Sequence, residues 1–240
     1  MKIRFMCMDC LIATGAPESV ATLELRSDGR YEYACLKGHR SVAVVQEQPF
    51  EFLFELGAHA VLDGYYREAV SGFTASLERF YEFYCLAICL KRDIARNDFV
   101  STWTTLSSNS ERELGAFVLS YLLENGTPPK LLGEKWRAFR NGVIHKGKIP
   151  SRQEAVRYGQ AVLDLICPTL RELRTKCGDA VGRTVFYHIE RAHEATPKEI
   201  PRGVVSLNTI LNIAKGEQPE SKNLEVELIC LGKNKDRFLN

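Results

Sequence analysis

The spacing of apolar residues predicts helices from residue 49 onward. One helix is indicated by apolar side chains three or four positions apart, at Phe50, Phe54, Ala58, Val61 and Tyr65. A second helix is longer, ends near Lys91, and has an apolar face made of Ala69, Val70, Phe73, Leu77, Phe80, Tyr81, Tyr84 and Ile88. The main body of the chain is therefore expected to begin with two amphipathic helices.

Helix-end signals divide the middle of the chain. Residues 110–113 (Ser-Glu-Arg-Glu) have the pattern of a capping box and Gly126 is a typical stop, so a helix is expected between them. The next helix is expected to begin at Pro128 and to end at Gly147. A second capping box at 151–154 (Ser-Arg-Gln-Glu) indicates that another helix begins there.

The last third of the chain is expected to be helical first and extended later. The helix from the second capping box runs toward Cys177 with a kink at Pro168, and a further helix covers residues 180–195. Residues 224–230 (Leu-Glu-Val-Glu-Leu-Ile-Cys) alternate between apolar and polar, which is typical of a strand. The alternatives for this strand are addition to an N-terminal sheet and pairing across a dimer.

The first 48 residues have a strand-like pattern. Residues 23–26 and 31–34 are short alternating runs separated by a turn at 27–30, which together predict a β-hairpin. A third strand is expected at 41–47. Too few apolar residues lie in this segment for it to fold alone, so a bound metal ion is favoured as a stabilising element.

Two pairs of metal-binding side chains lie in this N-terminal segment. Cys7 and Cys10 form a Cys-x-x-Cys motif, and Cys35 and His39 follow the second predicted strand. Four nitrogen and sulfur donors in two pairs suit tetrahedral zinc. Because four protein ligands fill the coordination shell, we expect one structural zinc ion per chain rather than a catalytic one. The alternative is that these are ordinary small residues of a core.

Composition narrows the class of protein. The 240 residues are 45% hydrophobic and 26% charged, as in an ordinary soluble globular protein. The net charge of +2 is too small to attract nucleic acid by itself, so any such contact needs a local basic patch. No apolar stretch approaches the ~18 residues of a membrane span, and the N-terminus does not resemble a signal peptide. These features favour the cytoplasm and argue against a membrane partner.

The strongest candidates for a catalytic role lie together in segment 139–147 (Phe-Arg-Asn-Gly-Val-Ile-His-Lys-Gly). Asn141 and His145 are four residues apart and share a helix face. Arg140 lies about 140° around the helix from His145, but its long side chain can reach the same cleft. Arginine grips phosphate oxygens and histidine transfers protons near neutral pH. Lys146 adds a supporting positive charge.

Two features of the second helix bear on this segment. Glu78 interrupts an apolar run, and it is interpreted either as an ion-pair partner that orients Arg140 or as a residue on a solvated edge. The aromatic run at 80–84 is interpreted as core and dimer packing, with base stacking as the alternative.

These side-chain types suit RNA cleavage that uses the 2′-hydroxyl of RNA as the nucleophile. The reaction needs a base for that hydroxyl, an acid for the leaving 5′-oxygen, and positive charge at the phosphate. His145 would serve as base or acid, Arg140 would hold the phosphate, and Asn141 would orient His145 or a phosphate oxygen. One histidine cannot be both acid and base at the same moment, so a symmetric dimer with two motifs in one cleft is expected.

The Arg-Asn-x-x-x-His pattern at 140–145, in a helical context, resembles the motif of the HEPN domain family (higher eukaryotes and prokaryotes nucleotide-binding). Residues 64–70 and 75–80 look like the early helices of that family, and the resemblance covers roughly residues 50–180. Many members are metal-independent ribonucleases of toxins and antiphage defence systems. The resemblance implies catalytic roles for Arg140, Asn141 and His145, and no metal in the cleavage step.

The resemblance also implies a composite site in a homodimer, RNA as substrate, and products with 2′,3′-cyclic phosphate and 5′-hydroxyl ends. A role in antiphage defence or growth arrest is implied, with an antitoxin or another defence-system protein as a candidate partner. The alternative function is a non-catalytic nucleic-acid or nucleotide sensor, or an interaction scaffold of a defence system. Some relatives keep the fold without the activity.

The expected fold class is mainly α: a HEPN-like helical bundle with a small N-terminal β zinc ribbon and a short C-terminal α/β tail. We expect a zinc-ribbon-like module at 1–48, a HEPN-like helical domain at 49–198, and a C-terminal extension with a strand at 199–240.

Overall fold

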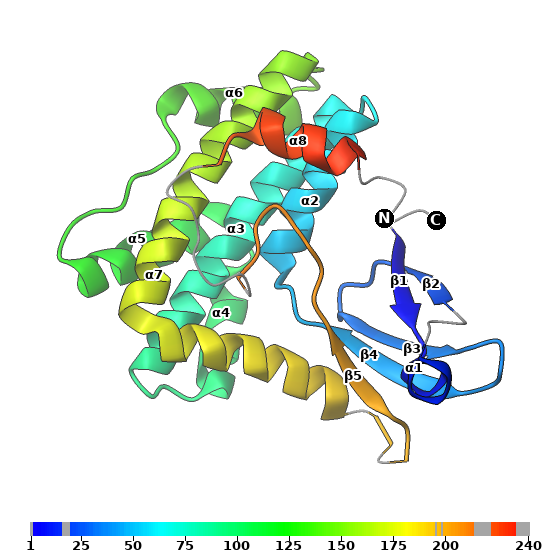
Figure 1. Cartoon of the computed structure of the whole chain (residues 1–240). Helices are drawn as coiled ribbons and strands as arrows, with labels where there is room; N and C mark the ends of the chain where they lie inside the picture. Colours follow the sequence, from blue (N-terminus) through cyan, green and yellow to red (C-terminus); the bar gives the residue numbers. More distant parts are fainter. Residues whose placement is uncertain (1, 16–19, 195, 198, 214–221, 234–240) are drawn as a thin grey trace. The chain divides into compact units, whose positions relative to one another are not determined.

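The computed structural model describes residues 2–15, 20–194, 196–197, 199–213 and 222–233, and the chain forms two compact units (Figure 1). The strand unit comprises residues 1–47, 185–208 and 231–240, and the helical unit comprises residues 48–184 and 209–230. The chain is mainly α-helical, with short strands near the N-terminus, which confirms the mainly α class. No helix in the described ranges is both long enough and apolar enough to cross a membrane.

The helical unit begins with the two helices that the apolar spacing predicts. Helix α2 spans Pro49–Leu62 and helix α3 spans Tyr66–Lys91. Gln48 caps α2 in a reciprocal capping box with Glu51, because the Glu51 side chain accepts a hydrogen bond from the Gln48 backbone N–H at 2.6 Å. Pro49 follows at the first helical position, where its missing N–H leaves no helical hydrogen bond unmade.

The remaining helices are α4 (Arg96–Leu106), α5 (Ser110–Asn125), α6 (Glu134–His145), α7 (Arg152–Glu194) and α8 (Leu224–Lys233). The last residues of α7 and of α8 belong to the strand unit, and the rest of these helices belongs to the helical unit. The predicted stop at Gly126 is confirmed, since this residue adopts the left-handed conformation that ends α5. The capping box before α7 is also confirmed, because Glu154 accepts from the Ser151 N–H at 2.9 Å and Ser151 Oγ accepts from the Glu154 N–H at 3.2 Å.

One predicted helix cap and one predicted helix start are wrong. Asn109, not Ser110, caps α5, and its side chain accepts a hydrogen bond from the Glu111 N–H at 2.8 Å. Helix α6 begins at Glu134 rather than Pro128, because Gly133 takes the capping position and its carbonyl accepts from the first turn. Consecutive prolines keep the preceding residues extended, which delays the helix.

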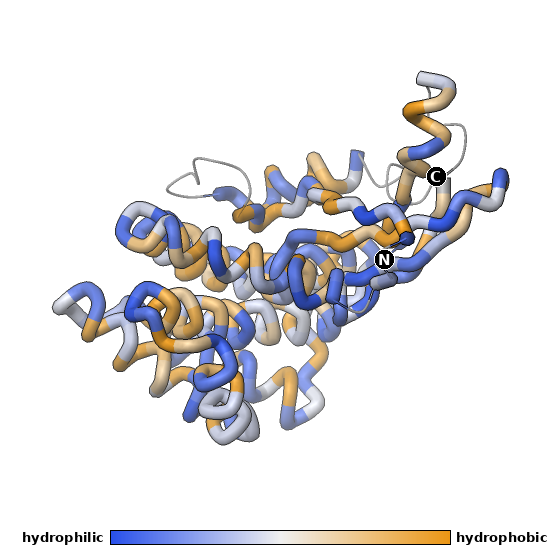
Figure 2. Tube along the Cα trace, turned by 90° about the horizontal axis from the view of Figure 1, so that it is seen from below, coloured by the Kyte–Doolittle hydropathy of each residue, from blue (hydrophilic) through white to orange (hydrophobic). Residues whose placement is uncertain are grey.

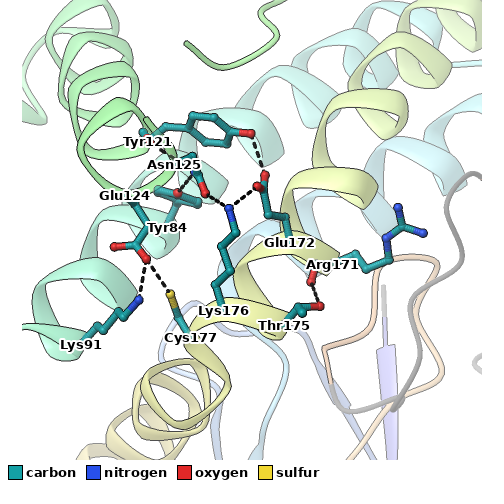
Figure 3. A network of polar contacts seen from close by, with 10 residues as sticks. All are labelled: Tyr84, Lys91, Tyr121, Glu124, Asn125, Arg171, Glu172, Thr175, Lys176 and Cys177. Atoms are coloured by element: carbon teal, nitrogen blue, oxygen red, sulfur yellow. Dashed lines mark hydrogen bonds and ion pairs between the residues drawn. The ribbon is translucent and has the colours of Figure 1, made fainter. Parts of the chain in front are cut away.

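The predicted kink at Pro168 is also wrong, because the break in α7 falls at Cys177, the only residue of that helix with non-helical backbone angles. A polar network joins α3, α5 and α7 around the break (Figure 3). The Cys177 thiol donates toward Glu124 at 3.7 Å, and Glu124 also pairs with Lys91 at 2.5 Å. Lys176 donates to Asn125 at 2.6 Å, so both residues at the break contact α5.

The core of the helical unit is aromatic. Phe73 of α3 lies against two glycines, Gly57 of α2 and Gly159 of α7, where an added Cβ would come within 2.7 and 2.6 Å of its ring. The run at 80–84 contributes to this core, as the packing interpretation requires, and Phe80 lies 5.3 Å from Phe50 between ring centroids. Figure 2 shows apolar and polar positions alternating along the helices, as expected for helices with one buried face.

The strand unit contains two small sheets. Strand β1 (Lys2–Met6) pairs antiparallel with β2 (Val20–Glu24), and the second sheet has the order β3–β4–β5, with β3 at Arg30–Ala34, β4 at Arg40–Val45 and β5 at Arg202–Val205. The predicted hairpin between 23–26 and 31–34 is therefore wrong, because β2 pairs with β1 while β3 pairs with β4. Strand β1 buries Ile3 and Phe5 on one face, so it offers β2 an alternating partner, although β3 lies nearer to β2 in the chain.

The C-terminal extension contains a strand, but not at the predicted position. Strand β5 adds in parallel to β4, with Val44 opposite Val204, so the extension does add to the N-terminal sheet. Residues 224–230 lie in helix α8, because Leu224, Leu228 and Leu231 recur at helical spacing and are buried together. Residues 214–221 and 234–240 of the extension lie outside the described residues.

Candidate functional site

Helix α6 brings Arg140 and Asn141 to the wall of a cavity in the helical unit. The two residues lie in the penultimate turn of the helix, and the Arg140 guanidinium donates to the Asn141 side-chain oxygen at 3.1 Å. Val143 lies three positions after Arg140 and is fully buried, so this end of α6 is packed into the helical unit. The adjacent pair therefore acts as one polar unit, with the amide oxygen holding one arm of the guanidinium.

Glu78 of α3 holds the other arm of the guanidinium. Its carboxylate accepts from Arg140 Nη2 at 2.7 Å, so the expected ion pair is present. Burial raises the pKa of Glu78 above its usual value, and the Arg140 charge opposes this by lowering it. A carboxylate that is costly to bury is thus kept against the arginine, which orients the guanidinium toward the cavity.

The cavity has a volume of about 460 Å³. Its lining includes Glu78 and Tyr81 of α3, Leu114 of α5, Arg140 and Asn141 of α6, and Tyr158 of α7. Lys146, the capping residue after α6, also lines it. The lining combines apolar side chains and an amide with three basic side chains and three carboxylates, the latter from Glu78, Glu111 and Glu134. It is therefore a polar cavity in which the Arg140 guanidinium and the Lys146 ammonium are the groups able to meet an anion.

His145 is the last residue of α6 and is exposed. It does not line the cavity, and within the described ranges of the chain its imidazole makes no hydrogen bond or ion pair. The structure therefore brings Arg140, Asn141, Glu78 and Lys146 together and leaves the imidazole open to solvent beside them.

Three residues of this cavity were not singled out in the sequence. Arg137 lies three positions before Arg140, so helical spacing alone could have identified it as a second cation on the same face. Tyr158 hydrogen bonds to Thr74 at 2.8 Å between hydroxyl oxygens, and burial raises the pKa of Tyr158 to about 12. No local pattern marks Tyr158 or Thr74, because they meet only through the packing of α7 on α3.

The strand unit contains a second candidate site, formed by Cys7, Cys10, Cys35 and His39, whose ligand atoms all lie within 4.8 Å of one another. Cys7 caps the short helix α1 (Met8–Thr14), which carries Cys10. Cys35 and His39 occupy the two ends of the β3–β4 turn, where the Cys35 N–H donates to the His39 carbonyl at 3.0 Å. Gly38 adopts the left-handed conformation that this tight turn requires.

The distances between these donors match one coordination shell. Zinc–ligand bonds of about 2.3 Å to sulfur and about 2.0 Å to nitrogen place tetrahedral donors about 3.8 Å apart for two sulfurs and about 3.5 Å apart for sulfur and nitrogen. The Cys10 and Cys35 sulfurs are 3.8 Å apart, and His39 Nδ1 lies 3.4 to 3.6 Å from the three sulfurs. These four residues therefore lie close enough to bind one metal ion.

Comparisons with known proteins add no relative: no family model, no curated protein and no solved structure matches this chain. The site must therefore be interpreted from its own geometry and from the motif that the sequence carries.

Proposed function

We propose that the chain is a metal-independent RNA endonuclease of the HEPN type, with Arg140, Asn141 and His145 as its catalytic residues. The observation that carries the proposal is the guanidinium of Arg140, held by Glu78 and Asn141 at the edge of a cavity, with an unpaired imidazole at the end of the same helix. A fixed cation beside a proton-transfer group is what 2′-hydroxyl transesterification needs.

In this proposal the 2′-oxygen of RNA attacks the adjacent phosphorus and loses its proton to a base. The bond from phosphorus to the 5′-oxygen breaks, and that oxygen receives a proton from an acid. The products carry a 2′,3′-cyclic phosphate and a 5′-hydroxyl. Arg140 binds the phosphate as negative charge builds up, Lys146 adds positive charge, and Glu78 keeps Arg140 oriented.

A homodimer supplies the second proton-transfer group. His145 is exposed at the end of α6, which leaves it accessible to a second copy of the chain. Two motifs facing each other across a symmetry axis would place one imidazole as base and the other as acid. Antiphage defence or growth arrest, and any antitoxin partner, rest on the family resemblance alone.

One observation favours a second candidate, a non-catalytic sensor of nucleic acid or nucleotides. The cavity is lined by Arg140 but not by His145, so a single chain has a binding surface without the proton-transfer group. In that case Arg140 binds phosphate and His145 is dispensable, and in an interaction scaffold neither residue is needed.

The test is RNA cleavage by purified wild type and by the variants His145→Ala and Arg140→Ala, without added divalent cations. A brief exposure to EDTA tests independence from magnesium, and the metal content of the protein is measured before and after to show that the four-ligand site stays loaded. We expect cutting by wild type alone, with cyclic-phosphate ends, and losses of at least about 100-fold in both variants.

Arg112→Ala is the matched control, because Arg112 is an exposed arginine of α5 that does not line the cavity. Loss of cutting in this variant would point to general charge rather than to the motif. RNA binding that depends on Arg140 but not on His145, with no cutting by any protein, would favour the sensor.

Zinc is the ion that we infer for the four-ligand site, one per chain and with a structural role. Three thiolates and one imidazole at tetrahedral spacing are typical zinc ligands. When bound, the ion would connect helix α1 to the β3–β4 turn and leave no coordination position for a substrate. Measurement of one zinc per chain in the wild type, and less in Cys35→Ser, tests this assignment.

A further inference from the structure

A second hollow, of about 400 Å³, lies on another face of α6. The side chains that define it are Lys135, Trp136, Phe139, Lys148, Glu154 and Arg157, and we call it the aromatic–basic hollow. It draws its residues from α6, from the turn after it and from the first turns of α7. It is separate from the Arg140 cavity, and Ala138 lines both.

The charges of this hollow are mostly positive. Lys148 is paired with Glu154 at 2.7 Å, and Glu154 is also held by the capping box of α7. Lys135 and Arg157 have no carboxylate partner within the part of the chain that the structure describes. Two cations are thus left to bind an anion, in a protein whose net charge of +2 provides little long-range attraction.

The aromatic rings of the hollow are held in place. Trp136 lies edge-to-face with Phe139 at 5.7 Å between ring centroids, and Tyr158 lies 6.0 Å from Trp136 and 5.7 Å from Phe139. Both rings are only half-buried, so part of each remains open. The ammonium groups of Lys135 and Lys148 lie 5.4 and 4.7 Å from the Trp136 and Phe139 ring centroids. A flexible lysine can move to a phosphate and leave the ring face to a base.

The hollow and the Arg140 cavity are joined by continuous structure. Tyr158 lines the cavity and packs against both rings of the hollow. The chain after α6 places Lys146 at the cavity and Lys148 at the hollow. A strand whose scissile phosphate lies at Arg140 therefore meets rings and cations on the next face of the same helix.

We propose that the aromatic–basic hollow binds one nucleotide of single-stranded RNA next to the cleavage position, with the base against Trp136 or Phe139 and a phosphate at Lys135 and Arg157. The proposal rests on the proposed function for its choice of RNA. The rings and cations themselves recognise a base and a phosphate, which single-stranded DNA also carries. Stacking on an aromatic ring and a basic rim are the two elements by which proteins bind single strands without reading their sequence.

Trp136 provides a direct measurement of occupancy. The chain has two tryptophans, and Trp103 is buried, so Trp103→Phe leaves Trp136 as the only fluorescent indole. This variant is titrated with a single-stranded oligonucleotide in its 2′-O-methyl RNA form, which lacks the attacking hydroxyl, and in its DNA form. We expect saturable quenching of the Trp136 emission by the RNA form, at least as tight as by DNA.

Substitutions separate stacking from charge. In the wild-type background, binding is measured with a dye-labelled form of the same RNA, and we expect Trp136→Ala to weaken it by about 5- to 100-fold and Trp136→Phe to retain most of it. Lys135→Ala and Arg157→Ala are each expected to weaken it and to reduce the slope of log affinity against log salt by about 0.7. Lys233→Ala, at an exposed lysine of α8, is the matched control and should change neither.

Glu154→Gln should tighten binding about 2- to 5-fold, because it releases Lys148 from its carboxylate and raises the positive charge of the hollow. The proposal would be overturned if the RNA did not quench Trp136 emission, or if DNA bound more tightly than RNA. It would also be overturned if neither Trp136→Ala nor Lys135→Ala changed the affinity. These outcomes are independent of catalysis. Quenching without any cleavage would support the nucleotide site in the hollow and contradict the proposed nuclease function. Cleavage without quenching would support the nuclease function and contradict the nucleotide site.

Discussion

The two units of this chain are stabilised by different means. The helical unit buries a continuous aromatic core in which Phe50, Phe73 and Phe80 are fully buried. The strand unit has one sheet of two strands and one of three, and the described apolar side chains that it buries are few. Its four metal-binding side chains come from two segments on either side of β2. Where apolar area is scarce, the metal ion that we propose would supply the missing stability, and where it is abundant the fold depends on packing.

This difference bears on function as well. The chemistry that we propose lies in the helical unit, where Arg140 of α6 is held by an ion pair with Glu78 of α3, a helix with many buried residues. The four donors of the strand unit would fill the coordination shell of the zinc ion that we propose and leave no reactive position. A unit built on a closed metal site suits recognition or structural support, whereas a unit with open polar cavities suits binding and catalysis.

Removal of the metal is expected to have the largest effect and to be confined to one unit. Cys10→Ser, or a strong chelator, should unfold the strand unit, because structural zinc contributes on the order of 10 kcal/mol in small zinc modules. Amide hydrogen exchange should become fast in β1–β4 and stay slow in α2 and α3. Cys230→Ser, at an exposed cysteine, is the control. Slow amide exchange in β1–β4 without metal would show that the strand unit does not need a metal ion for its stability.

Removal of an aromatic ring from the core should destabilise the helical unit instead of the strand unit. Phe80→Ala removes a buried side chain in contact with Phe50 and Phe117 and should lower the free energy of unfolding by about 3–5 kcal/mol. Leu123→Ala, on the exposed face of α5, should change it by less than about 0.5 kcal/mol. Both are measured by denaturant unfolding of the metal-loaded protein, followed by circular dichroism. A loss in Phe80→Ala as small as in Leu123→Ala would show that packing is not the main support.

Local patterns predicted the features that depend on neighbouring residues. Helices α2 and α3, the Gly126 stop and the four-ligand cluster all follow from spacings of a few positions. The sequence also indicated that Glu78 would pair with a cation such as Arg140, because a carboxylate on an apolar helix needs a cationic partner.

Long-range pairing could not be predicted in the same way. Strand β5 joins β4 from far along the chain, and the partner of β2 is set by the competing strand β1. Residues 224–230 satisfy both the two-residue and the helical period, so only their packing decides between strand and helix. Tyr158 joins the cavity through tertiary contact alone.

A single methyl group can test how closely the helical unit is packed. Gly159→Ala places a Cβ within 2.6 Å of the Phe73 ring and 2.7 Å of Leu224, so it should lower the free energy of unfolding by about 1–3 kcal/mol. Gly182→Ala, in the same helix, meets no atom within 4 Å and should raise it by about 0.5–1 kcal/mol. Thermal unfolding of the two variants measures this difference. A stabilising Gly159→Ala would show that α3, α7 and α8 are less closely packed than we describe.

The smallest effect concerns a charge at the surface of the helical unit, Glu154. Its hydrogen bond from Lys148 and those from Ser151 lower the pKa of Glu154 to about 2, from a usual value of 4.5. Because the folded-state pKa is depressed, the stabilisation is fully present above about pH 4.5 and is lost as the pH falls toward 2. The side chain is exposed, so Glu154→Gln should lower the free energy of unfolding by less than about 1 kcal/mol at pH 7. The free energy of unfolding of wild type and variant is measured at pH 7, 5 and 3, and the difference between them should shrink only below pH 4.5. A difference that is constant with pH would assign the effect to the helix cap rather than to the charge.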